Sequence, residues 1–257
     1  MRSFSAIFVL IVSAGLFMSM SAPQQRDAEA MWDRANTAYV NGDYSKAIVT
    51  YDSIADAGYV SRKLYYNLGN AWFKNGGVGK AVLNYNRALR LDPSDPDTRH
   101  NLRIASAHVK DKIEPVPEFF LSGWFRAWGR TMGPDGWAVI SLCMFAVMFG
   151  SVLLYLLSRS LRLRKAGFYI ALFTLLVGLA AVSFAVNQKK GIENSSEAVV
   201  MIESVAVKSS PDASGKELFI LHEGTKVRIT GSLGGWYETV IADGNKGWMP
   251  QNSLEVI

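Results

Sequence analysis

Few of the side chains that commonly perform catalysis lie near one another in this sequence. The three histidines, His100, His108 and His222, are scattered and show no metal-ligand spacing. Segment 76–79 is glycine-rich, but it lacks the lysine–serine/threonine ending of a phosphate-binding loop, because Ala81 follows Lys80. The single cysteine, Cys143, lies in an apolar run and excludes a disulfide framework within one chain. We therefore expect a protein that is not an enzyme and that uses no cofactor and no metal.

The sequence contains two long apolar runs, and the segments on either side of them are the candidates for binding. Residues 136–158 and 166–187 carry no charge, and each run is long enough for a helix to cross a bilayer. Residues 159–165 between them carry four positive charges and no acid, and short basic loops stay in the cytoplasm. We predict two transmembrane helices joined by a cytoplasmic basic loop, with both flanks outside. The alternative is a buried helical hairpin of a soluble protein.

The second apolar run contains a stripe of small residues at helical spacing. Such stripes allow membrane helices to approach closely. We expect the stripe to pack on the first run, although a partner's helix is an alternative. Its members are Ala171, Thr174, Gly178, Ala181 and Ala185.

The N-terminus is typical of an export signal. One early positive charge, Arg2, precedes an apolar stretch and then small residues, so we predict a signal peptide over 1–22, with an uncleaved anchor as the alternative. The net charge of +5 does not indicate nucleic acid binding, because four of the positive charges lie in the predicted basic loop.

Residues 28–113 contain a degenerate helical repeat. Gly42 and Gly76 lie 34 positions apart, and we expect each to end the first helix of a pair in a left-handed conformation. The second copy has small residues at Gly69 and Ala81, where paired helices would approach closely, and an aromatic residue at Tyr85. This pattern resembles tetratricopeptide (TPR) repeats, here as two repeats and a capping helix.

The TPR resemblance implies a concave groove for a peptide or protein. Asn36, Asn67 and Asn70 match positions at which some relatives bind a ligand's backbone or terminal carboxylate. The lysines of that carboxylate clamp are missing, because Trp32 and Asp97 stand in their places. The alternative is that these asparagines are merely solvated. The predicted groove residues are Asn36, Tyr39, Asn67, Asn70 and Lys74.

Residues 114–135 read as a linker followed by an interfacial helix. Pro115 and Pro117 stop a helix, and Phe120, Trp124 and Trp128 then recur every four residues. Such an aromatic face suits the surface of a membrane, with packing beneath the repeats as the alternative.

Residues 195–257 change to a two-residue period typical of short strands. Asp243-Gly244 indicates a tight hairpin, and short strands at this spacing indicate a small barrel. The segment resembles a bacterial SH3-like (SH3b) domain, and that resemblance implies binding of peptides or cell-wall material. We expect Trp236 to pack in the barrel. The surface candidates for ligand binding are Lys208, Ser209, Tyr237 and Trp248.

The expected fold class is a multidomain membrane protein with an α-helical TPR domain, a two-helix transmembrane hairpin and a small all-β barrel. This order of parts resembles the Bacteroides aerotolerance (Bat) group. That resemblance implies a multi-pass protein of the inner membrane, with both soluble domains in the periplasm. Implied partners are Bat-type membrane proteins with von Willebrand A domains and, indirectly, a MoxR-type AAA+ ATPase. The predicted function is a non-enzymatic scaffold; the alternatives are a peptidoglycan-binding tether and an accessory subunit of a cell-wall hydrolase.

Overall fold

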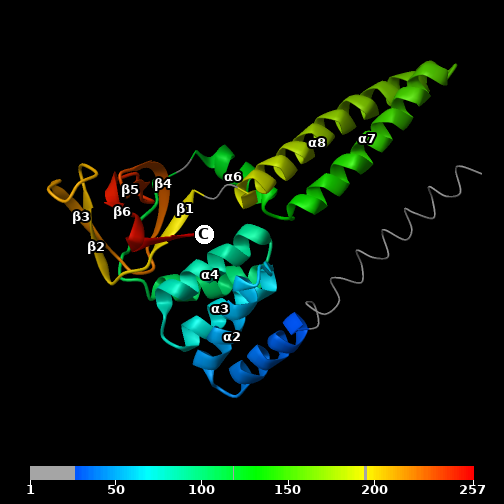
Figure 1. Cartoon of the computed structure of the whole chain (residues 1–257). Coiled ribbons are helices and arrows are strands. Elements are labelled where there is room, and N and C mark those ends of the chain that lie inside the picture. The colour runs from blue at the N-terminus through cyan, green and yellow to red at the C-terminus, as the bar shows by residue number, and fades with distance from the viewer. Residues whose placement is uncertain (1–26, 118, 194–195) are drawn as a thin grey trace, which may run out of the picture.

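The computed structural model of the 257-residue chain describes residues 27–117, 119–193 and 196–257. The predicted signal peptide, residues 1–22, lies outside the described residues. The N-terminal part of the described chain is helical, and the C-terminal part is a β-sheet (Figure 1). Residues 27–40 form the first helix, followed by α2 (Tyr44–Asp56), α3 (Arg62–Lys74), α4 (Val78–Leu91) and α5 (Pro96–Ala107).

Local sequence signals explain where these helices begin and end. The side chains of Asp43, Ser61 and Asp95 each accept a hydrogen bond from a backbone N–H group of the helix that follows. Gly42 and Gly76 have φ angles of 80° and 88°, so both adopt the left-handed conformation that the sequence predicts. The two turns therefore match across the 34-residue period.

Two long apolar helices leave the helical part as a hairpin (Figure 1). α7 covers Pro134–Leu157, and α8 covers Leu161–Glu193, a length of about 50 Å at 1.5 Å per residue. Both are long and apolar enough to cross a membrane. Only 11% of the most apolar segment of α7 and 17% of that of α8 is buried within the protein. The connector is shorter than the predicted loop 159–165, because α8 already begins at Leu161 and includes Arg162, Arg164 and Lys165.

The small residues of α8 face α7. Thr174, Gly178 and Ala181 are buried, and a Cβ atom built on Gly178 would lie 3.4 Å from the ring of Phe145 in α7. A Cβ atom on Gly167 would lie only 2.8 Å from the carbonyl oxygen of Ser151 and 3.0 Å from the amide of Tyr155. Of the two packing alternatives, the structure therefore shows the stripe against α7.

Gly167 offers a direct test of this packing. We expect Gly167→Ala to push the two backbones apart and to lower the free energy of unfolding by about 1–3 kcal/mol, because backbone atoms cannot move aside as a flexible side chain can. Gly150→Ala in α7 is the matched control, since a Cβ atom there meets nothing within 4 Å. The measurement is SDS-induced unfolding in mild detergent, followed by circular dichroism. Equal midpoints for the two variants would contradict the close approach.

Helix α6 (Phe120–Gly129) lies at the base of this hairpin. The carbonyl oxygen of Gly129 accepts hydrogen bonds from Nε1 of Trp137 (2.8 Å) and from Nε2 of Gln188, which joins α6 to both long helices. The ring of Trp128 stacks on that of Trp124 and meets Phe184 of α8 edge to face. The predicted aromatic face is thus held where the hairpin begins.

Residues 197–256 form one antiparallel sheet of seven strands in the order β3-β2-β6-β5-β4-β1-β7. A short 3-10 helix, Gln251–Ser253, precedes the last strand. Strands from both halves of this order contribute to one apolar core, so the sheet must curl around it. The core includes Leu221, Val200, Val207 and Met249. The strands are β1 (Glu197–Val200), β2 (Ser204–Lys208), β3 (Glu217–His222), β4 (Lys226–Leu233), β5 (Trp236–Val240), β6 (Lys246–Pro250) and β7 (Leu254–Val256).

Two local expectations for the sheet have different outcomes. The predicted turn at Asp243-Gly244 joins β5 to β6, and Gly244 has a φ of 89°. Trp236, expected to pack inside the barrel, is only half-buried and does not belong to the apolar core. The alternation of β5 explains this result, because Thr239 is buried on the inner face and Trp236 lies on the other face.

The helical part and the sheet pack directly on each other through α4 and β1 (Figure 1). Leu83 and Tyr85 of α4 share one buried apolar cluster with Val199 of β1 and with Ile257. The two parts therefore form one unit with a common core, and they must lie on the same side of any membrane that the hairpin crosses.

Polar contacts border this common core on one side. The Glu255 carboxylate forms ion pairs with the ammonium group of Lys80 at 2.6 Å and with the guanidinium group of Arg87 at 3.2 Å. Arg87 also donates to the carbonyl oxygen of Val256 at 2.7 Å, and Arg90 donates to that of Ile257. Basic side chains of α4 thus hold the last strand.

A second polar contact lies where the chain leaves α5. The Asp111 carboxylate accepts hydrogen bonds from the His222 backbone N–H (2.7 Å), from its ring Nδ1 (2.6 Å) and from the Thr225 hydroxyl (2.6 Å). Burial alone would raise the pKa of Asp111, but the bonds from Thr225 and His222 outweigh it, so the pKa lies below its usual range. Asp111 therefore stays charged at neutral pH and ties the turn between β3 and β4 to the helical part.

Candidate functional site

Two adjoining pockets lie on one face of the helical part. The first, of about 230 Å³, includes Asn36, Tyr39, Asn67 and Asn70 in its lining. The second, of about 300 Å³, includes Tyr39, Asn70 and Lys74. Tyr39 and Asn70 belong to both pockets. The structure thus brings the five predicted groove residues together around one continuous hollow.

An asparagine–tyrosine–asparagine network lies at the first pocket. The Tyr51 hydroxyl donates to Oδ1 of Asn36 at 2.6 Å, and Nδ2 of Asn67 donates to the same oxygen at 3.3 Å. Tyr51 is buried and its pKa is raised by that burial, so its hydroxyl remains a donor at neutral pH.

The same network recurs 34 residues later at the second pocket. The Tyr85 hydroxyl donates to Oδ1 of Asn70 at 2.7 Å, and Nδ2 of Asn101 donates to that oxygen at 2.9 Å. Nδ2 of Asn101 also lies 3.2 Å from the Tyr66 hydroxyl. Tyr85 is 1% exposed, and burial raises its pKa as well.

The two networks decide which amide atoms are available to a ligand. The Oδ1 atoms of Asn36 and Asn70 each accept two hydrogen bonds, whereas their Nδ2 groups donate to no described residue. Asn67 and Asn101 use their Nδ2 groups internally and keep Oδ1 as an acceptor. Each copy of the network therefore has one donor and one acceptor that no other described residue uses, a pattern that suits the N–H and C=O groups of an extended peptide.

Tyr66, Tyr85 and Asn101 line the second pocket but are not among the predicted groove residues. The 34-residue period contains the signal for two of them, since Asn101 follows Asn67 and Tyr85 follows Tyr51 at that distance. Lys74 lies at the exposed rim.

The second candidate surface is the outer face of the β-sheet. Lys208, Trp248 and Glu238 lie opposite one another on β2, β6 and β5, so their side chains share one face. Trp236 lies two positions from Glu238 on the same face, with Nζ of Lys208 6.0 Å from its ring centroid.

The predicted ligand set of the sheet is only partly gathered. Lys208 and Trp248 are neighbours, whereas Tyr237 lies opposite buried Met249 on the other face of β5. Ser209 follows Lys208 at the end of β2, where its N–H donates to the carbonyl oxygen of Lys216 at 2.9 Å. Trp236, which the sequence suggested as a core residue, takes the place of Tyr237 on this face. The strand register, and not the composition, determines the exchange.

No described part of the chain presents the geometry of a metal centre. Among residues 27–117, 119–193 and 196–257, no three or more His, Cys, Asp or Glu side chains are grouped so that they could hold a metal ion.

The comparisons with known proteins agree with the architecture of the sheet. The family model described as bacterial SH3 domain matches residues 203–255. This match begins at β2 and ends within β7, so it covers all strands except β1. No curated protein matches the chain. A bacterial SH3 domain suggests binding of protein or peptidoglycan.

Proposed function

We propose that this protein is a non-enzymatic, membrane-anchored scaffold that binds an extended protein segment in the hollow formed by the two pockets. The observation that carries the proposal is the asparagine–tyrosine–asparagine network, which recurs after 34 residues and leaves a free donor and acceptor in each copy. The recurrence also supports the assignment of the helical part as two TPR repeats with α5 as the capping helix.

The hairpin supplies the anchor in this proposal. Large apolar side chains on α7 and α8, such as Leu142, Phe149 and Phe173, are each more than 60% exposed, which is unfavourable in water and favourable in lipid. The basic residues at the tip favour a cytoplasmic turn. The protein then spans the inner membrane twice and presents both soluble parts in the periplasm.

The proposed partners follow from the order of the parts. A signal, TPR repeats, a hairpin and an SH3-like domain occur together in the BatE members of the Bacteroides aerotolerance group, which the chain resembles. We therefore propose Bat-type membrane proteins with von Willebrand A domains as clients of the hollow, and a MoxR-type AAA+ ATPase as an indirect partner across the membrane.

Crosslinking with two variants at Asn70 tests the hollow. The full-length protein is crosslinked in its native membrane, purified in mild detergent and analysed by mass spectrometry. Asn70→Asp keeps an oxygen that accepts from Tyr85 and Asn101 but replaces the free Nδ2 donor by an oxygen. We expect this change to lower client recovery by about tenfold.

Asn41→Ala is the matched control for Asn70→Asp, because Asn41 lies in the exposed turn before α2, outside both pockets. It should leave recovery unchanged. Recovery that falls in Asn70→Ala but not in Asn70→Asp would assign the asparagine to folding alone and contradict the proposal.

The second candidate function is a peptidoglycan-binding tether, or an accessory subunit of a cell-wall hydrolase. The half-buried Trp236 and Trp248, with Lys208 beside them, favour it, because aromatic rings on an open face can stack on sugars. Retention of the detergent-solubilised protein on purified peptidoglycan tests this function. Retention that Trp248→Ala abolishes and Tyr237→Phe preserves would support the tether; no retention of the wild type would exclude it.

A further inference from the structure

A basic pocket lies where the helical part, the sheet and the hairpin meet. Its volume is about 550 Å³, and its lining includes Arg90 of α4, Arg99 of α5, Gln188 of α8 and Arg228 of β4. Arg130, immediately after α6, also belongs to the lining. These five separate stretches of the chain thus contribute to one hollow that neither candidate surface uses.

The charges of this basic pocket are unbalanced. Its lining holds five cationic side chains and a single carboxylate, that of Glu197. Glu197 pairs with Lys226 at 2.7 Å. Arg130 and Arg228 are exposed at the surface and form no ion pair with any carboxylate that the structure describes. Cations held this close repel one another, so an anion in the pocket would be stabilised.

Two lining residues of the basic pocket, Arg90 and Gln188, each have a buried polar atom without a partner among the described residues. Nε of Arg90 is buried and has no hydrogen-bond partner among the described residues, although its guanidinium group also donates to Ile257. Oε1 of Gln188 is buried and unpaired as well. A buried donor without an acceptor is unfavourable, so an oxygen acceptor that reaches this arginine would be stabilising.

The basic pocket also lies beside the point at which the apolar part of α8 ends. Gln188 is one residue beyond the apolar part of α8, and its Nε2 group donates to the end of α6. α6 exposes Phe120 and Trp124, at 72% and 59%, beside this junction. Aromatic side chains in such positions mark the boundary between lipid and water.

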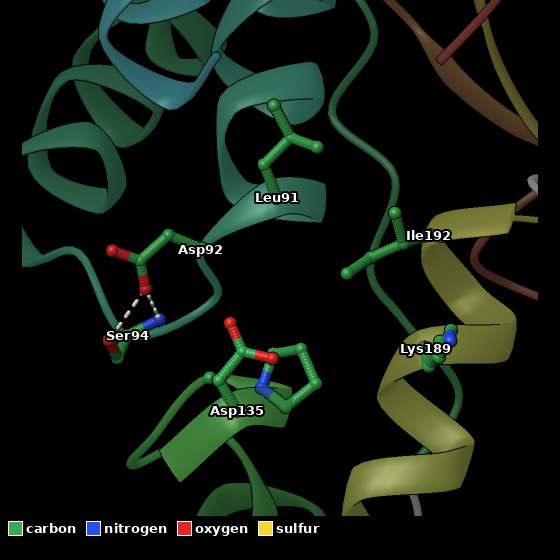
Figure 2. A pocket seen from close by; sticks show the side chains of 8 residues that line it. Leu91, Asp92, Ser94, Asp135, Lys189 and Ile192 are labelled. Atoms are coloured by element: carbon green, nitrogen blue, oxygen red, sulfur yellow. Dashed lines mark hydrogen bonds between the residues drawn. The ribbon is translucent and has the colours of Figure 1, made fainter. Parts of the chain in front are cut away.

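Basic character is specific to this side of α8. Another pocket, of about 600 Å³, lies against the neighbouring residues Lys189 and Ile192 (Figure 2). Asp92 and Asp135 are part of its lining, and Oδ1 of Asp92 accepts hydrogen bonds from the backbone and hydroxyl of Ser94. The end of the hairpin is therefore not basic all round, and an anion would be attracted to only one side.

We propose that the basic pocket binds the phosphate of an anionic phospholipid headgroup from the leaflet that the hairpin enters. This inference rests on the proposed membrane insertion. Arg130 and Arg228 are exposed members of the lining, and Arg90 is a partly buried member whose Nε has no partner among the described residues. Guanidinium groups suit this task because they bind phosphate oxygens through two parallel hydrogen bonds. The lipid would lock the soluble unit to the membrane surface in one orientation.

The test uses the full-length protein in nanodiscs of phosphatidylcholine, with or without phosphatidylglycerol. Lipid retention is measured by native mass spectrometry after mild detergent release, and thermal stability is measured in the same discs. We expect phosphatidylglycerol to be retained and to raise the Tm of the wild type. In the double variant Arg130→Gln/Arg228→Gln we expect about tenfold weaker retention and loss of the Tm increase.

The control removes the same charge elsewhere. Lys63→Gln/Lys110→Gln changes two exposed lysines outside the basic pocket and should retain phosphatidylglycerol as the wild type does. Equal retention by the Arg130/Arg228 variant and the control would overturn the proposal. The same Tm increase from soluble glycerol phosphate, without anionic lipid, would assign the pocket to a free phosphate and overturn the lipid source.

One further measurement separates this proposal from the proposed function. Carbonate extraction reports whether the wild type is integral to the membrane, independently of lipid class. Extraction of the wild type by carbonate would contradict the proposal that the hairpin anchors the protein in the membrane. Resistance to extraction without any preference for phosphatidylglycerol would defeat only the phosphate site.

Discussion

Replacing Asp111 by alanine should loosen the contact between the helical part and the sheet more than any other single polar change. The substitution removes one carboxylate that serves the His222 backbone, the His222 ring and the Thr225 hydroxyl. Hydrogen bonds to a charged group are each worth about 1.5–3 kcal/mol, and bonds that share one acceptor are not additive. We expect a loss of about 3 kcal/mol in the free energy of unfolding.

Urea unfolding of the full-length protein in mild detergent, followed by tryptophan fluorescence, measures this loss, since Trp236 and Trp248 lie in the sheet. Asp33→Ala is the control, because the exposed Asp33 carboxylate forms no hydrogen bond with another described residue. A shift no larger than that of the control would mean that the Asp111 contact does not contribute measurably to stability.

The Asp111 contribution should also depend on pH in a defined direction. The folded protein holds the pKa of Asp111 below the ordinary aspartate value of about 3.9, so the unfolded chain binds more protons in acid. The stabilisation is complete above that value and is lost as pH falls through the lowered pKa. Wild type and Asp111→Ala should therefore differ at pH 7 and converge only below about pH 4. A constant difference across this range would contradict the assignment.

Substituting Gly69 by alanine should be the most damaging small change in the helical part. A Cβ atom at Gly69 would lie 2.7 Å from two ring carbons of Tyr85. That ring is 1% exposed and its hydroxyl is held by Asn70, so it has no room to move aside. Overpacking costs about 1–3 kcal/mol or more, against a gain of about 1 kcal/mol in helix propensity. We expect a net loss of about 2 kcal/mol.

A double-mutant cycle with Tyr85→Leu checks this mechanism. In the leucine background the ring is absent, so Gly69→Ala should cost much less than in the wild type. The measurement is thermal unfolding in detergent followed by circular dichroism. Equal costs in both backgrounds would show that Gly69 is required for a reason other than contact with Tyr85. The Tyr85→Leu background also removes the hydroxyl bound to Asn70, so client recovery by this variant should fall along with that of Asn70→Asp.

The rigid union of the two soluble parts has a consequence for the proposed scaffold. The hollow lies on helices 27–40, α3 and α5, and the outer sheet face lies on β2, β5 and β6, while α4 packs between the helices and β1. Ligands of the two surfaces would therefore be held at a fixed separation, not at the ends of a flexible linker.

The sequence alone determined the elements whose signals are local. The left-handed conformations of Gly42 and Gly76, the turn at Asp243-Gly244 and the two long apolar helices all follow from residue types within a few positions of one another. Most strand positions also follow from a two-residue period. The five groove residues were predicted from the resemblance to TPR repeats, and the structure places them around the two adjoining pockets.

The tertiary structure decided the features that depend on distant partners. Whether Trp236 or Tyr237 faces outward is set by the register of β5 against β6, and a two-residue period does not reveal which face is buried. The contact of Asp111 with His222 joins residues 111 positions apart, and the basic pocket gathers cations from the helical part, the hairpin end and the sheet. Such positions have no signature along the chain, because their chemistry arises only when separate elements pack against one another.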